Sequence, residues 1–177
     1  MIHEFPDGLL IGAIDGLGHG PEAAVAARLC AGMLSDYSGE PLVQTIAKCH
    51  AALRGTRGVA LSLCTLDAKS SFWAWAGVGN VAGVLLRQSG GPTRQREFLI
   101  QRNGVVGGRM TKPTVSRTHA APGDVMTLAT DGIRADYSLG MDLTGTPQKI
   151  AERIMDGYAT GKDDALVLVA RYEGRPS

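Results

Sequence analysis

The sequence has almost no net charge, no basic tract and no long apolar run. Its 177 residues include 18 Lys and Arg against 17 Asp and Glu, which gives a formal net charge of +1. Because the basic residues are scattered, general binding to nucleic acid or to a membrane surface has little support. The longest apolar stretches have the length of strands and are too short to cross a bilayer. No basic-then-apolar leader follows Met1, so we expect a cytoplasmic protein.

Cysteine is also scarce. The three cysteines, Cys30, Cys49 and Cys64, are odd in number and contain no Cys-X-X-Cys pair. Cys30 and Cys49 lie in helical patterns and Cys64 lies in a strand pattern. We interpret them as buried thiols that act as small hydrophobic side chains.

The remaining composition is that of an ordinary globular protein, with 44% hydrophobic and 20% charged residues. A chain of this length can bury a sizeable core without disulfide or metal staples. No internal repeat, low-complexity tract or linker divides it. The sequence therefore predicts a single domain that spans residues 1–177.

Apolar periodicity predicts an early pair of helices, a β-rich centre and a late single helix. The helices are expected at residues 20–37, 42–53 and 146–158, and the strands at residues 9–14, 59–67, 71–78, 81–87, 97–101, 115–120, 124–130 and 165–172. We expect a turn at residues 90–92, and we expect the strands at 115–120 and 124–130 to pair with each other. This order differs from the alternating rhythm of a parallel βαβ fold. It favours an α+β domain with mostly antiparallel sheets covered by helices.

Three short acidic signals flank the predicted strands. Residues 15–20 read Asp-Gly-Leu-Gly-His-Gly after one apolar run, residues 130–132 read Thr-Asp-Gly after another, and residues 163–165 read Asp-Asp-Ala before a third. Carboxylates at the ends of buried strands are costly to desolvate unless a positive charge neutralises them. If the three ends converge, they form an oxygen-ligand site for hard cations.

Two other interpretations of the glycine-rich segment at residues 16–20 stay open. A dinucleotide-binding turn also joins a strand to a helix through glycines. However, Asp15 would repel a bound pyrophosphate unless a cation intervened. In addition, a second helix follows the first, where a dinucleotide fold has a strand ending in an acid. The segment could also be a plain connector with a turn-forming Asp.

The acidic signals, together with the glycine-rich segments at residues 77–80 and 103–107, resemble a known family. The chain is similar to the metal-dependent protein phosphatases of type 2C, and within them to the SpoIIE-like branch, over residues 9–172. Its short, sensor-free length resembles the stand-alone RsbX type of stress-signalling complexes. The resemblance implies a four-layer αββα sandwich, in which two mostly antiparallel sheets are flanked by helix pairs.

The resemblance also implies a site for two Mn²⁺ or Mg²⁺ ions. Asp15 would bridge the ions and the Gly16 carbonyl would complete one shell, while Asp131 and Asp163 would hold the pair from the other side. Asp164 falls where the family has Asn or Asp and would support them. Paired ions activate water for direct attack on phosphorus. The implied substrates are phosphoserine and phosphothreonine in small bacterial signalling proteins of the STAS-domain type, and we expect a monomer.

His19 is the histidine that lies inside a motif. One hypothesis is that it donates a proton to the departing Ser or Thr oxygen, and the alternative is a hydrogen-bonded loop residue. Arg102, Arg109 and Arg134 are candidates for phosphate contact, without a spacing argument that selects among them. Trp73 and Trp75 alternate on one strand, which favours packing over ligand stacking.

One departure from the family pattern generates a rival hypothesis. The family has a further acid on a strand before residue 9, whereas residues 2–5 of this chain can supply only the end of such a strand. Asp7, next to Gly8, is typical of a hairpin turn instead. If that acid is absent, one metal ion should bind more weakly. The chain could then be a weakened or inactive binding module of the same fold.

Overall fold

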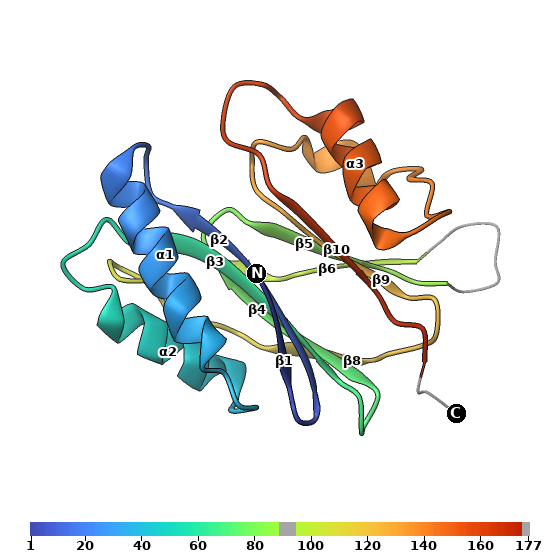
Figure 1. Cartoon of the computed structure of the whole chain (residues 1–177), viewed down its shortest axis with the longest axis horizontal. Coiled ribbons are helices and arrows are strands. Elements are labelled where there is room, and N and C mark those ends of the chain that lie inside the picture. The colour runs from blue at the N-terminus through green and yellow to red at the C-terminus, as the bar shows by residue number, and fades with distance from the viewer. Residues whose placement is uncertain (89–94, 175–177) are drawn as a thin grey trace.

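The computed structural model describes residues 1–88 and 95–174, in which two β-sheets are stacked between helices (Figure 1). The predicted turn at residues 90–92 lies outside the described residues. Within the described ranges, no helix combines the length and the apolar character needed to cross a membrane.

The first sheet has six strands. In chain order they are β1 (Ile2–Phe5), β2 (Gly8–Gly16), β3 (Val59–Asp67), β4 (Phe72–Val78), β7 (Gln101–Arg102) and β8 (Ser116–His119). The spatial order is β1-β2-β3-β4-β7, and β8 also pairs with β4. All pairs are antiparallel except the short β4–β7 pair. Asp7 lies in the tight turn between β1 and β2, as predicted.

The second sheet has four antiparallel strands. They are β5 (Ala82–Leu86), β6 (Arg96–Phe98), β9 (Val125–Ala129) and β10 (Val167–Arg171), in the spatial order β10-β9-β5-β6. Trp73 and Trp75 of β4 are buried in the core between the two sheets, which confirms their packing role. Cys64 lies in the same core.

Helices cover the outer face of each sheet (Figure 1). The helices α1 (Pro21–Ser35) and α2 (Leu42–Ala52) pack on the first sheet through one hydrophobic core. The helix α3 (Pro147–Tyr158) and the short 3-10 helix η1 (Ala135–Ser138) pack on the second sheet through another. The predicted α+β sandwich of four layers is therefore confirmed. One α-helix and a 3-10 helix form the second outer layer, where the resemblance implied a helix pair.

The predicted pairing of residues 115–120 with 124–130 is wrong. The strand β8 pairs with β4 in the first sheet, whereas β9 pairs with β5 and β10 in the second sheet. The Ala-Pro-Gly sequence at residues 121–123, a common hairpin signal, instead carries the chain from one sheet to the other.

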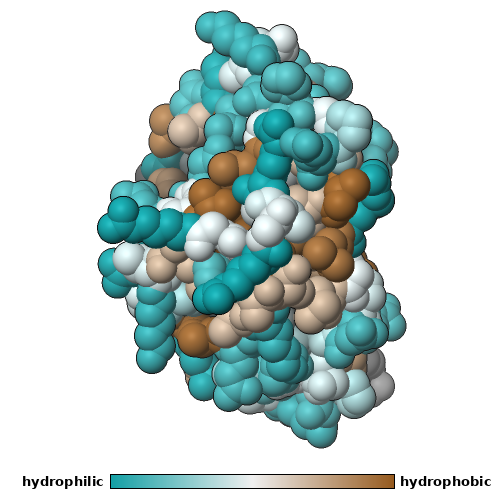
Figure 2. All heavy atoms as spheres, turned by 90° about the vertical axis from the view of Figure 1, so that its left-hand side faces the viewer, coloured by the Kyte–Doolittle hydropathy of each residue, from teal (hydrophilic) through white to brown (hydrophobic). Residues whose placement is uncertain are grey.

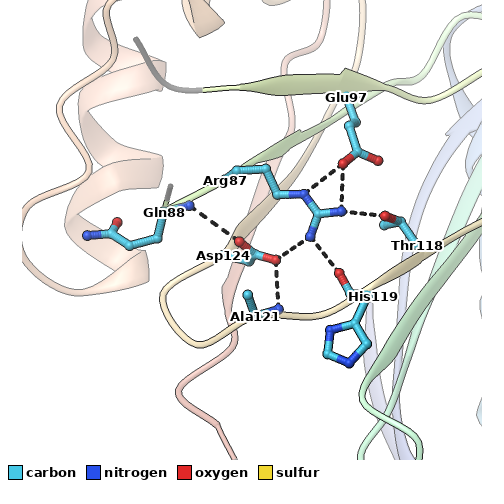
Figure 3. A network of polar contacts seen from close by, with 7 residues as sticks. All are labelled: Arg87, Gln88, Glu97, Thr118, His119, Ala121 and Asp124. Carbon is cyan, nitrogen blue, oxygen red and sulfur yellow. Dashed lines mark hydrogen bonds and ion pairs between the residues drawn. The ribbon is translucent and has the colours of Figure 1, made fainter. Parts of the chain in front are cut away.

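A buried arginine stabilises this crossing (Figure 3). Arg87, at the end of β5, forms an ion pair with Asp124 at 2.6 Å, and their side chains are only 14% and 1% exposed. The guanidinium also donates to the carbonyl of His119 at 2.5 Å and to the Thr118 hydroxyl, both in β8. Glu97 of β6 is a further partner, at 2.7 Å from Arg87 Nε. A single side chain thus joins strands of both sheets at one end of the sandwich.

We expect Arg87→Met to lower the free energy of unfolding by about 3–5 kcal/mol, because it leaves the Asp124 carboxylate buried without its cation. The matched control is Arg134→Met, which breaks an ion pair whose two side chains are each 55% exposed and should cost about 1 kcal/mol or less. Urea unfolding of both variants measures the difference. Equal losses would contradict the assigned role of Arg87.

Candidate metal centre

Asp15 lies near the end of β2 and faces the second sheet. Side chains alternate along a strand. Ile11 and Ala13 lie in the core between the sheets, whereas Leu10 and Ile14 pack toward the helices. Asp15 continues the row of Ile11 and Ala13, so its half-buried carboxylate points toward the strands of the second sheet.

The other two acidic segments lie at the adjoining end of the second sheet. The strands β9 and β10 are antiparallel, and Ala129 pairs with Val167. Consequently, the residues that follow β9 meet the residues that precede β10. The strand β2 also contacts both β9 and β10. Asp131, Asp163 and Asp164 are all exposed at this end.

Hydrogen bonds of Thr130 link the segment that follows β9 to the segment that precedes β10. Its backbone N–H donates to the carbonyl of Leu166 at 3.1 Å. Its hydroxyl oxygen accepts the Leu166 N–H at 2.9 Å and donates to the Asp164 carbonyl at 3.4 Å. Thr130 is buried, so these bonds are shielded from water. They hold the backbones next to Asp131 and Asp164 in a fixed relation.

Two glycines allow the backbone to approach closely around the carboxylates. A Cβ on Gly132 would lie 2.4 Å from the carbonyl oxygen of Asp164, and a Cβ on Gly16 would lie 2.3 Å from that of Ala23 in α1. Neither distance is possible for a larger residue. Gly132 lies in a turn that the Ile133 N–H closes on the Thr130 carbonyl at 3.0 Å, and its lack of a Cβ is needed for close packing against the Asp163-Asp164 segment.

The electrostatics of Asp15 agree with this convergence of the three segments. Its pKa is raised above the usual value of 3.8, first by burial and then by the negative charges of Asp131, Asp163 and Asp164. Three carboxylates of the second sheet thus repel the Asp15 carboxylate at one end of the sandwich. A divalent cation with a preference for oxygen ligands relieves such repulsion, so the donor set fits the expected ions.

The carboxylates are not yet arranged as a ligand cage. Among residues 1–88 and 95–174, no three His, Cys, Asp or Glu side chains stand close enough to hold one ion. Asp131 accepts a hydrogen bond from the amide of Asn80, and Asp163 accepts the backbone N–H of Asp164 at 2.8 Å. Ion binding therefore requires these side chains to turn toward a common point.

Sequence reasoning did not select Asn80 as a site residue. The sequence signal that pointed to it was the glycine-rich segment at residues 77–80. The structure shows why glycine is needed there. Gly79 has a φ of 99°, and a Cβ there would lie 2.5 Å from Cβ of Ala60, which is the register partner of Asp15. This tight turn brings Asn80 from the first sheet to Asp131 of the second.

The loop between β2 and α1 presents Gly16 and His19. Gly18 and Gly20 have φ values of 80° and 85°, a region that favours glycine. His19 is exposed, and within the described residues it makes no hydrogen bond or ion pair. The structure therefore places His19 near the strand end that carries Asp15, with a free side chain.

The arginine candidates differ in how they are held. The Arg102 guanidinium donates to the Thr114 hydroxyl at 2.8 and 3.0 Å. Arg134 pairs with Asp136 at 3.2 Å and lies 5.0 Å from the centre of the Tyr158 ring. Arg109 is exposed next to the bridge between Gly104 and Met110. These contacts hold Arg102 and Arg134 in place but do not direct either of them at the carboxylates.

The comparison with known proteins assigns the family. The family described as Stage II sporulation protein E (SpoIIE) matches residues 6–173. The chain belongs to the SpoIIE family. The phosphoserine phosphatase RsbX of Bacillus subtilis (strain 168) is 23% identical over 164 residues, which cover 91% of this chain and 79% of that protein. The resemblance drawn from the motifs is thus confirmed.

Solved structures support the same assignment for this SpoIIE-family chain. One, from work on the bacterial stressosome as a modular system adapted to control secondary messenger signalling, is 27% identical with a TM-score of 0.85, covering 97% of this chain and 88% of that chain. RsbX in complex with magnesium is 20% identical with a TM-score of 0.80, covering 95% and 82%. The SpoIIE-family chain therefore shares the fold of RsbX and is homologous to that phosphoserine phosphatase.

We expect Asp15→Asn to stabilise the metal-free protein at neutral pH by less than about 1 kcal/mol, because the group is only half-buried. Its raised pKa means that the native state binds more protons than the unfolded chain. Stability is therefore present at low pH and is lost as the pH rises from 3.8 through the raised pKa. Asn cannot ionise, so the gain should disappear at pH 3.

Thermal unfolding in EDTA at pH 7 and at pH 3 measures this effect. Asp136→Asn, which removes an exposed carboxylate outside the cluster, is the control and should show no such gain. A destabilised Asp15→Asn protein at pH 7 would show that its carboxylate is not under repulsion.

Proposed function

We propose that this protein is a Mn²⁺- or Mg²⁺-dependent phosphatase of phosphoserine and phosphothreonine residues in proteins. The observation that supports it most is that Asp15 of the first sheet and Asp131, Asp163 and Asp164 of the second lie at the same end of the sandwich. Such a concentration of negative charge repels a phosphate ester unless cations neutralise it. Membership of the SpoIIE family and homology to a phosphoserine phosphatase also support this function.

In this proposal, Asp15 and the Gly16 carbonyl would hold the two ions from the first sheet. Asp131 and Asp163 would hold them from the second sheet, and Asp164 would support them. The ions would supply an activated water and positive charge for an in-line displacement at phosphorus. The Asn80 amide, which donates a hydrogen bond to the Asp131 carboxylate, would have to adjust when that carboxylate turns toward the ions.

His19 is proposed to supply the proton for the leaving group. A serine or threonine alkoxide is a poor leaving group, and a protonated imidazole can donate from Nε2 or Nδ1 as the P–O bond breaks. The free, exposed side chain of His19 on the loop after Gly16 is compatible with this role. The three cysteines are not compatible with a catalytic role, because all of them are buried away from a substrate.

The proposed substrates are small bacterial signalling proteins, such as the phosphorylated STAS-domain subunits of a stressosome. The similarity to RsbX and to a chain from stressosome work supports this substrate class. We further propose that the protein acts in the cytoplasm as a monomer.

A non-catalytic binding module is a second candidate. It is favoured by one observation, namely that the described carboxylates do not stand as a ligand set. Hydrolysis of p-nitrophenyl phosphate across a series of Mn²⁺ concentrations separates the two candidates. Turnover that depends on Mn²⁺ supports the phosphatase, and no turnover at any concentration supports the module. A nucleotide-binding function gains no support, because Asp15 at the glycine-rich turn belongs to the acidic cluster.

We expect Asp15→Asn to lower Mn²⁺-dependent turnover of p-nitrophenyl phosphate by more than about a hundredfold, since loss of a shared ligand should exceed the effect of outer-shell changes. Cys30→Ser is the control for a thiol mechanism and should keep the wild-type rate per folded molecule. Near-normal turnover of Asp15→Asn, or loss of turnover on changing any cysteine, would contradict the mechanism.

The role of His19 is tested by the leaving group. We expect His19→Gln to slow hydrolysis of a phosphoserine peptide by about 10²–10⁴-fold, while p-nitrophenyl phosphate, whose leaving group needs no proton, keeps its rate. His119→Gln, at the opposite end of the sandwich, controls for loss of an imidazole. Equal effects of His19→Gln on both substrates would remove His19 from proton transfer.

A further inference from the structure

The helix α1 exposes two of its branched apolar side chains to solvent. Val25 and Leu29 are 50% and 40% exposed, and they follow Pro21 at intervals of four residues, so the three form one ridge. The opposite side of the helix, which packs on the first sheet, is made of Ala23, Ala26, Cys30 and Leu34. Its first three turns thus pack with small residues and leave the branched ones uncovered. Figure 2 shows apolar surface among hydrophilic side chains on the corresponding side of the molecule.

A cleft of about 480 Å³ lies beside this ridge, between the start of α1 and the connection from α2 to β3. It is lined by Pro21, Glu22, Val25, Gly55, Thr56 and Arg57. We call the ridge and the cleft together the α1 face. An apolar ridge next to a cleft is the shape that receives side chains of another protein.

The α1 face is continuous with the candidate metal centre. The N–H of Leu17, two residues after Asp15, donates to the Gly58 carbonyl at 3.0 Å. The Arg57 guanidinium lies against Gly18, because a Cβ built there would be 2.8 Å from Arg57 Nη1. A protein seated on the α1 face therefore also reaches the loop that carries His19.

The charge around the α1 face is positive, in contrast to the metal centre. Arg28, Arg54 and Arg57 are exposed around it. Glu22 is the carboxylate of the cleft lining, and Arg57 already pairs with it at 2.6 Å. Both side chains of this pair are well exposed, so the pair is weak and a competing carboxylate can replace Glu22. An acidic partner is therefore favoured over a basic one.

We propose that the α1 face docks the phosphoprotein substrate through an acidic helix with an apolar side, at a distance from its phosphorylated residue. This inference rests on the proposed function and adds the substrate surface that the protein recognises. The apolar side of the substrate helix packs on Val25 and Leu29, and its carboxylates pair with Arg28, Arg54 and Arg57. Docking in this way raises the local concentration of the phosphorylated residue at the carboxylate cluster.

The test compares the double variant Val25→Glu, Leu29→Glu with the wild type. Glutamate is a good helix former, so α1 should keep its fold, which circular dichroism and thermal unfolding verify. Phe98→Glu is the matched control, because Phe98 is an apolar side chain of β6 that is 59% exposed on the second sheet.

Two measurements are made with an intact phosphorylated STAS-domain protein. The first is its Kd in EDTA, which does not depend on turnover. The second is kcat/KM with Mn²⁺, compared with a short phosphoserine peptide from the same protein. We expect the double variant to weaken binding and kcat/KM for the intact protein about tenfold or more, as loss of central contacts does at interfaces. The peptide should be hydrolysed at the wild-type rate, and Phe98→Glu should resemble the wild type throughout.

Wild-type binding that weakens with added salt also supports docking through the arginines. The proposal is overturned if the intact protein does not bind, if the double variant binds it as the wild type does, or if peptide and protein lose activity equally. It is also overturned if light scattering shows a wild-type dimer that the double variant dissociates, because a second copy then covers the α1 face. If no substrate is hydrolysed but binding depends on Val25 and Leu29, the proposed phosphatase function is wrong, whereas the proposal that the α1 face binds a partner protein is supported.

Discussion

The repulsion that the half-buried Asp15 carboxylate meets from three other carboxylates is the constraint on which the candidate site depends. Asp15 reaches the end of the sandwich from the first sheet, and Asp131, Asp163 and Asp164 reach it from the second. Their convergence costs stability unless positive charge is supplied. The local geometry nevertheless maintains it, through the hydrogen bonds of Thr130 and the close approach of Gly132 to Asp164. The proposed cation site would explain why the chain keeps an arrangement that is unfavourable by itself.

The two ends of the sandwich balance charge in different ways. At one end, the buried Arg87 neutralises Asp124 and joins both sheets (Figure 3). The strand β9 runs from Asp124 at this end to Asp131 at the other. The protein thus carries its own cation where the sheets are joined, and we propose that exchangeable ions neutralise the carboxylates at the opposite end.

Local patterns predicted most of the elements, because strand and helix periodicity are properties of neighbouring residues. The three acidic signals were found in the same way, each beside its strand. The failures came from contacts between distant residues. Residues 121–123 have the composition of a hairpin turn, yet they connect the two sheets. The contacts of Arg87 with β8 and with Asp124 stabilise this connection. Likewise, the contact of Asn80 with Asp131 depends on the stacking of the sheets. The exposure of Val25 and Leu29 could not be predicted from the sequence. Their spacing shows that they share one face of the helix, but it does not show whether that face is buried or exposed.

The most direct test of the central claim is anomalous diffraction from crystals soaked in Mn²⁺. We expect anomalous peaks between Asp15 of the first sheet and Asp131 and Asp163 of the second, with oxygen ligands at coordination distance. Crystals that bind no Mn²⁺ at this end of the sandwich, or bind it only at unrelated surface acids, would contradict the account.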